Sequence, residues 1–167
     1  MQVSTESIRA LRERTGAGIM DSKRALEAAG GDIEQAEAAL RAKGVAKAAA
    51  KADRVTAEGV IDCYVHAGSR IGAMVELNCE TDFVARTPDF QELAHNLAMQ
   101  IAAMSPLYVD ENEMPADETR KPEEVCLVKQ AFIKDSSKTI NDLILDVRAR
   151  VGENVQVARF VRFGLGE

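Results

Sequence analysis

The sequence has no excess of positive charge, few cysteines and no long apolar run. Its net charge of −6 supplies no large positive field for phosphates, so partners are expected to be proteins and direct nucleic-acid binding is not expected. Cys63, Cys79 and Cys126 are odd in number and widely spaced, which fits neither a disulfide framework nor paired zinc ligands. All three are expected to be reduced, buried thiols.

No apolar stretch approaches the ~20 residues that a membrane-spanning helix needs, and the start MQVSTESIRA lacks the basic-then-apolar order of a signal peptide. We therefore expect no membrane association and a cytoplasmic location. The sequence also lacks a P-loop, carboxylates spaced as in glycosidases and His/Cys clusters. No cofactor and no metal are expected.

A thiol nucleophile is the one catalytic arrangement that needs to be weighed. Cys79 would require His66 and Glu80, the only combination that a hairpin in this region could bring close. Cys79 is more simply an inward residue of a strand, and no glycine loop marks an oxyanion site beside it. The protein is therefore not expected to be an enzyme.

Residues 1–43 have the pattern of three short helices. Ser4 is placed to cap the first helix, and the glycines of residues 15–18 are placed to end it. Gly30 and Gly31 end the second helix, and Asp32 can begin the third. The predicted bundle has a small core, so it is marginal alone unless it is docked or held by a partner.

Residues 44–56 are expected to be a linker. The stretch KGVAKAAAKADR, residues 43–54, is rich in alanine and lysine and has a glycine at the expected break. We interpret it as a partly helical, solvated and flexible connector. The alternative, a basic patch for RNA, is disfavoured by the acidic character of the whole chain.

Residues 57–167 predict an α+β core domain. Two extended runs, residues 60–66 and 71–79, are joined by a connection of hairpin length. A helix from residue 87 to Met104, apolar in an i, i+3, i+4, i+7 register, is expected to cover the apolar face of the hairpin. The β-rich residues 155–163 are expected to return as a third antiparallel strand.

The part of the core between that helix and the last strand is less regular. Residues 105–122 carry three of the four prolines and predict an irregular connection. Residues 125–133 are apolar without a clear period, which fits a strand or a short buried segment. Thr139 and Asp142 then resemble a capping box for a helix that Gly152 closes.

The segment ELNCETDFVARTPDF, residues 76–90, turns from strand to helix at a corner. Thr81 is placed to cap a short helical turn, and Thr87 before Pro88 separates this turn from the next helix. Phe83 then has two interpretations: it joins the apolar stripe of the next helix, or it projects outward with Asp82 into a partner. The spacing does not decide between them.

Two long segments resemble the signatures of the elongation factor Ts family. Residues 12–26, RERTGAGIMDSKRAL, resemble the N-terminal signature, and residues 76–86, ELNCETDFVAR, are similar to the second. Further likeness covers nearly the whole chain in GDIEQA, AEGVI, HAGSRIG, LAMQIAA, FIKDSSKT and GENVQVARFVRF. The resemblance implies a ubiquitin-associated-like N-terminal domain, followed by a core whose three-stranded antiparallel sheet is covered by helices.

The resemblance also implies a function: a guanine nucleotide exchange factor for the translation GTPase elongation factor Tu. In that family the Asp-Phe pair of TDFVA enters the GTPase domain near its magnesium and phosphate site. The implied wedge residues here are Thr81, Asp82, Phe83, Val84, Ala85 and Arg86. The implied contacts of the N-terminal domain are Arg12, Gly16, Ala17, Gly18, Ile19, Met20, Asp21 and Lys23, and His66 is implied to meet another domain of the partner.

The chain departs from many members of the family in having one core module. Short members pair as homodimers, so a homodimer is expected here. The stretch between Glu118 and Cys126 is shorter than in the usual short form. Relatives work in the bacterial cytosol and in organelles, so the matrix of an organelle is the second expected location. A ubiquitin-type interaction adaptor is the alternative function, although it would leave the core unused.

Overall fold

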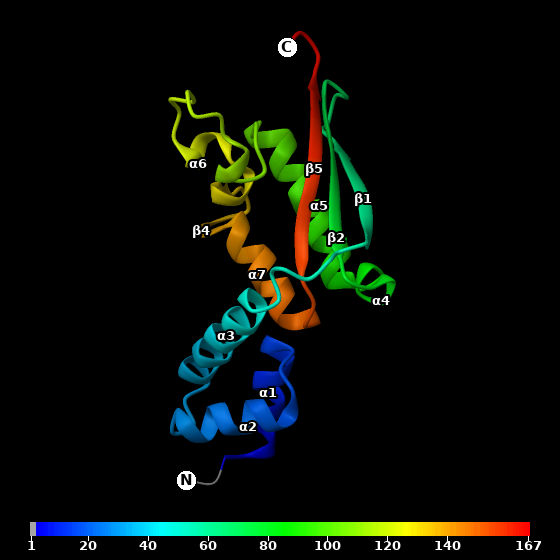
Figure 1. Cartoon of the computed structure of the whole chain (residues 1–167). Coiled ribbons are helices and arrows are strands. Elements are labelled where there is room, and N and C mark those ends of the chain that lie inside the picture. Colours follow the sequence, from blue (N-terminus) through cyan, green and yellow to red (C-terminus); the bar gives the residue numbers. More distant parts are fainter. Residues whose placement is uncertain (1–2) are drawn as a thin grey trace.

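The computed structural model describes residues 3–167, apart from the side chains of residues 45, 48 and 49. A helical N-terminal unit lies at one end of the molecule, and an α+β core follows it, with the C-terminus at the far end (Figure 1). The predicted fold class, including the three-stranded antiparallel sheet, is confirmed. Residues 1–2 of the predicted domain 1–43 lie outside the described residues.

Three helices form the N-terminal unit: α1 (Thr5–Thr15), α2 (Ile19–Ala28) and α3 (Ile33–Ala49). Ser4 caps α1 as predicted, because its hydroxyl accepts a hydrogen bond of 3.0 Å from the backbone N–H of Ser7. Gly16 ends α1 with a left-handed φ of 67°. The buried core shared by these helices consists of Leu11, Leu26 and Ala36.

The core domain is built on the sheet β1-β2-β5, in which all neighbours are antiparallel. Its strands are β1 (Glu58–Val65), β2 (Ile71–Cys79) and β5 (Val155–Gly164). The inner face of β2 is buried and consists of Ala73, Val75, Leu77 and Cys79. The predicted hairpin and the predicted third strand are confirmed.

Helix α5 (Pro88–Met104) lies across this inner face (Figure 1). Its residues Phe90, Leu97 and Ile101 face the sheet and are fully buried, as the helical register predicted. The register fails at its last position: Met104, the final residue of α5, is 48% exposed, and the left-handed Ser105 ends the helix directly after it.

The chain between α5 and the last strand contains short elements. They are η1 (Glu111–Glu113), α6 (Pro122–Val125), η2 (Leu127–Lys129), β3 (Ala131–Phe132) and β4 (Asp135–Thr139), and the longer helix α7 (Ile140–Val151) follows them. One more short helix, α4 (Asp82–Ala85), precedes α5. The apolar residues 125–133 therefore span three elements. Buried Gln100 fixes this segment, because its amide donates to the Ala131 carbonyl (3.1 Å) and accepts from the Ile133 N–H (3.0 Å).

The predicted capping box of α7 is present. The Thr139 hydroxyl accepts from the Asp142 N–H (3.2 Å), and the Asp142 carboxylate accepts from the Thr139 N–H (2.9 Å). This second bond is the main cause that holds the pKa of Asp142 below its ordinary value. Gly152, with φ of 74°, ends the helix as predicted.

The outer face of the sheet carries no covering helix within residues 3–167, since α5 and α7 pack on the inner side. The strand register groups its residues in two apolar rows and one charged row. The apolar rows are Cys63–Met74–Val161 and Val65–Gly72–Phe163, and the charged row is Ile61–Glu76–Arg159. Phe163 is 72% exposed and Val65 61% exposed, so an apolar surface is left open.

Helix α3 extends into the predicted linker and packs against α7. Residues 44–49 are therefore helical, and the irregular connection covers only residues 50–57. The contact is close because Gly44 has no side chain: a Cβ there would lie 2.7 Å from the Cβ of Ala149. Arg41 adds an ion pair of 2.9 Å with Asp146. The division of the chain at residues 43 and 57 stays a prediction. The connector is partly helical, and most of its described side chains are exposed, as its composition suggested, although its helical part is docked on α7.

Replacing Gly44 by Leu is expected to separate α3 from α7, because the new side chain would occupy the space of Ala149. We expect a loss of about 1–3 kcal/mol in the free energy of unfolding and faster trypsin cleavage at Lys51 and Arg54. Thermal denaturation and timed proteolysis measure both. The control is Ala38→Leu at an exposed position of α3; equal behaviour of the two variants would contradict the packing argument.

Candidate partner-binding site

The corner after β2 is a single helical turn with one buried and one exposed side. Thr81 caps α4, and its hydroxyl accepts from the Val84 N–H at 3.5 Å. Val84 and Ala85 are buried in the core, which anchors the turn. Asp82 and Phe83 occupy the remaining side and are presented away from the core.

Phe83 is 79% exposed, so the interpretation that it joins the stripe of the next helix is wrong. The reason is the break that was predicted at Thr87, which is extended (ψ 145°) and caps α5 through the Phe90 N–H. Phe90, and not Phe83, begins the buried stripe. Leaving a phenylalanine in water forgoes roughly 1.5–3 kcal/mol of burial energy, which favours a contact role for this ring.

Asp82 lies one position before the exposed ring and pairs with Arg86 at 2.9 Å, one turn later. Asp82 is 46% and Arg86 77% exposed, so this ion pair contributes little to stability. Both charges remain available to another molecule. The corner therefore presents a carboxylate, a guanidinium and a benzyl group together at the surface.

The second group of predicted residues lies around the start of α2. Ile19 is 57% and Met20 60% exposed, although both are large and apolar. Gly18 is the N-cap of α2, and exposed Arg12 and Lys23 flank the segment on α1 and α2. Half-buried Ala17 and exposed Gly16 complete the loop between these helices.

Asp21, another residue of this group, forms ion pairs with residues of its own chain. Its carboxylate accepts a hydrogen bond of 2.8 Å from Lys43 on α3 and lies 3.6 Å from Arg24. The hydrogen bond from Lys43 is the main cause that lowers the pKa of Asp21 below its ordinary value. Asp21 therefore ties α2 to α3.

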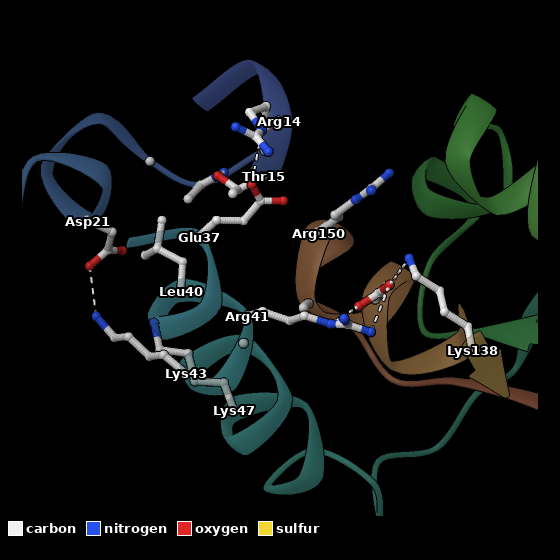
Figure 2. A pocket seen from close by; sticks show the side chains of 16 residues that line it. Arg14, Thr15, Asp21, Glu37, Leu40, Arg41, Lys43, Lys47, Lys138 and Arg150 are labelled. Atoms are coloured by element: carbon white, nitrogen blue, oxygen red, sulfur yellow. Dashed lines mark hydrogen bonds and ion pairs between the residues drawn. The ribbon is translucent and has the colours of Figure 1, made fainter. Parts of the chain in front are cut away.

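Figure 2 shows a cleft of about 330 Å³ between the α1–α2 loop, α3 and α7, with Asp21 and Lys43 among the side chains that line it. Arg41 crosses from α3 toward α7, where Lys138 also lies 3.4 Å from Asp146. The charges of the cleft are largely paired with one another. The cleft thus lies at the interface between the N-terminal unit and the core.

His66 lies far from α4. It follows β1 at the hairpin turn, whereas α4 follows the other end of β2, where Glu58 pairs with Cys79. Eight or nine residues of strand separate the two ends, which is about 25 Å. His66 is exposed and its Nδ1 lies 3.0 Å from the Tyr64 hydroxyl. The structure does not bring it into the corner.

The same distance excludes the thiol nucleophile. Cys79 is fully buried, its Sγ donates to the Thr81 carbonyl (3.1 Å), and burial raises the pKa of the thiol. His66, the base that the weighed arrangement requires, lies at the opposite end of the sheet. Cys79 and Cys126 are buried as expected, but Cys63 is exposed because it lies on the outer face of the sheet.

Sequence reasoning missed the residues behind the corner. Glu153, in the turn between α7 and β5, accepts hydrogen bonds from Thr81, while Glu80 accepts one from the Asn154 N–H at 2.7 Å. The hydrogen bond from Asn154 is the main cause that lowers the pKa of Glu80. The only signal was the GEN of GENVQVARFVRF, and nothing local links it to residues more than seventy positions earlier.

Within residues 3–167, no group of three or more His, Cys, Asp or Glu side chains is arranged to hold a metal ion. No helix in the described part of the chain combines the length and the apolar character needed to cross a membrane.

The family model and the similar proteins that match this chain carry the same family name. The family model described as elongation factor TS matches residues 26–124 and 119–167. The elongation factor Ts of Thermotoga petrophila is 47% identical over 195 aligned positions, covering 100% of this chain and 98% of the relative. That of Fervidobacterium nodosum is 47% identical with full coverage of both chains, and that of Syntrophomonas wolfei is 47% identical, covering 99% and 91%.

The alignment with the Thermotoga petrophila protein is 28 positions longer than the 167 residues of this chain. The two matched segments of the family model meet at residues 119–124, which is where the sequence looked shortened. In the structure this place holds the start of α6 and the Glu118–Arg120 ion pair of 2.7 Å.

Both matched segments together cover most of the chain, and the relatives align over nearly their whole length. The order of helices, sheet and exposed corner agrees with the fold that the two signatures implied. The chain belongs to the elongation factor Ts family of translation elongation factors.

Proposed function

We propose that this protein binds elongation factor Tu and accelerates the release of GDP from it. The observation that carries the proposal is the exposed Phe83, held beside Asp82 on a turn whose opposite side is buried in the core. A ring anchored in this way can enter a partner without unfolding its own domain. No covalent bond needs to be made or broken.

The proposed mechanism is mechanical and electrostatic. Phe83 acts as a wedge that moves a helix of the GTPase, and Asp82 accompanies it toward the magnesium and phosphate site. Once magnesium ligation is disturbed, the diphosphate loses much of its charge compensation and dissociates faster. Thr81, Val84, Ala85 and Arg86 form the rigid turn that carries the wedge.

The coupling between nucleotide binding and factor binding then determines when the factor binds and when it is released. If the bound factor weakens GDP binding, bound GDP weakens the factor by the same ratio, because the coupling free energy between two ligands is reciprocal. The same reciprocity applies to GTP, whose rebinding expels the factor. The protein is thus released after each exchange and acts on many GTPase molecules.

The N-terminal unit supplies a second contact in this proposal. Exposed Ile19 and Met20, with Arg12 and Lys23 nearby, form a mixed apolar and basic surface at the start of α2. Such a surface suits a protein partner with complementary apolar and acidic groups. Gly16, Ala17 and Gly18 shape the loop, and Asp21 holds it to α3. His66, at the far end of the sheet, is proposed to reach a different domain of the partner.

We further propose that the protein is a homodimer that joins through the outer face of the sheet. This face exposes the rows around Met74 and Phe163, and the Glu76–Arg159 ion pair (2.7 Å) borders them. Two copies facing each other would bury both apolar surfaces in a sheet-on-sheet packing. As a translation factor, the protein is proposed to work in the cytoplasm.

Phe83→Ala and Asp82→Ala are expected to abolish most of the acceleration of GDP release. Truncating a central contact of this kind typically costs 2 kcal/mol or more, which corresponds to about thirtyfold in rate or affinity. Release of fluorescent GDP from elongation factor Tu measures the effect. The control is Leu107→Ala, since Leu107 is also exposed (50%) but lies outside the corner. Wild-type rates in both corner variants would contradict the wedge.

Charges on the outer face are expected to separate the dimer. Met74→Glu combined with Val161→Glu places two carboxylates on neighbouring positions of that face. Sedimentation equilibrium should give twice the chain mass of 18.1 kDa for the wild type and the single mass for the variant. Gln91→Glu, at an exposed position of α5, is the control. A monomeric wild type would refute the dimer.

A further inference from the structure

The turn between α7 and β5 holds the corner that carries Asp82 and Phe83. After Gly152 ends α7, the Glu153 carboxylate reaches the corner and accepts three hydrogen bonds there. Its Oε2 accepts from the backbone N–H groups of Glu80 (3.1 Å) and Thr81 (3.0 Å), and its Oε1 accepts from the Thr81 hydroxyl (2.7 Å). Hydrogen bonds to a carboxylate are about twice as strong as neutral ones.

The connection also runs in the opposite direction. Glu80 accepts from the backbone N–H of Asn154 (2.7 Å), so each of the two segments binds the backbone of the other through a carboxylate. Arg54 lies 3.3 Å from the second oxygen of Glu80. Hydrogen bonds in both directions therefore hold the corner against the α7–β5 turn.

The Thr81 hydroxyl links this network to the short helix. A hydroxyl has one proton, and in Thr81 this proton is donated to Glu153. The oxygen lone pairs are left for the Val84 N–H, which they cap at 3.5 Å. Because α4 has only four residues, this cap and the buried side chains are what set its orientation.

The network extends to the connector that follows α3. Asn154 is fully buried, and its amide donates to the carbonyls of Ala52 and Arg54, both at 2.9 Å. The connector, the α7–β5 turn and the corner thus meet at Glu153 and Asn154. The α7–β5 turn therefore contacts both the corner that carries α4 and the connector that leads from the N-terminal unit, which carries α2.

We propose that Glu153 is the positioning residue of the exchange wedge. It fixes the direction in which Phe83 projects and, through the adjacent Asn154, fixes α4 relative to the connector of the N-terminal unit. This inference rests on the proposed exchange function. Glu153 itself touches the corner from behind and acts through Thr81 and Glu80.

The test compares Glu153→Gln and Glu153→Ala with matched controls at Glu113. Glu113 also accepts a backbone hydrogen bond, from the Val109 N–H at 2.8 Å, but lies in the connection after α5. GDP release is measured over a range of factor concentrations. We expect the rate at saturation to fall at least tenfold in the Glu153 variants, with less than a threefold change in the half-saturating concentration. Glu113→Gln and Glu113→Ala should match the wild type.

A second measurement reads the orientation of the wedge without the partner. The chain contains no tryptophan, so Phe83→Trp introduces a unique fluorophore at the tip of the corner. Its fluorescence anisotropy should fall when Glu153→Gln is added and stay unchanged when Glu113→Gln is added. Circular dichroism confirms that each protein is folded, and the milder Gln variant serves if the Ala variant does not fold.

The outcomes separate the two proposals. If wild-type protein fails to accelerate GDP release, the exchange function and this inference both fail. If Phe83→Ala is slow but the Glu153 variants keep the wild-type rate and anisotropy, only the positioning role is overturned. A fall in thermal stability with unchanged saturating rate and anisotropy would make Glu153 merely structural and would also overturn it.

Discussion

The structure depends on the backbone break between α4 and α5. Thr87 precedes a proline and is held out of the helical region, so the turn before it and the long helix after it have independent phases. If the helix were continuous, the residues before the break would follow the register of α5. The interruption instead lets Val84 and Ala85 face the core while Phe83 stays outside.

The arrangement of the two halves follows from a second close contact. Gly44 allows α3 to approach α7, and the Arg41–Asp146 pair crosses the same seam. Helix α7 then leads directly into the turn that binds the corner through Glu153. A single path of packed elements therefore connects the exposed apolar residues of α2 with the exposed ring of α4, the two surfaces that we propose as partner contacts.

The two faces of the sheet differ in what covers them. The inner face is covered by α5 and supplies the stability of the core, whereas the outer face keeps apolar rows in water. In the proposed homodimer, the same face of a second copy would bury these rows. The residues missing relative to the longer members lie near 119–124, beside α6, and leave both the sheet and the corner intact.

The sequence by itself determined most of the local structure: the long helices, the hairpin and the last strand, the caps at Ser4 and Thr139, and the break at Thr87. These features depend on residues within about four positions, so the chemistry of a short segment is sufficient. The family signatures also pointed to the corner before its geometry was known.

Only the tertiary structure decided which of the key groups are buried, which are exposed and which distant groups are in contact. The exposure of Phe83 and Cys63, the docking of α3 on α7 and the contact of Glu153 with Thr81 all depend on residues that are distant in the chain. An apolar residue fits a core and an interface equally well by composition. Which of the two it occupies is settled by the elements that pack around it, and these elements are brought together only by the folded chain.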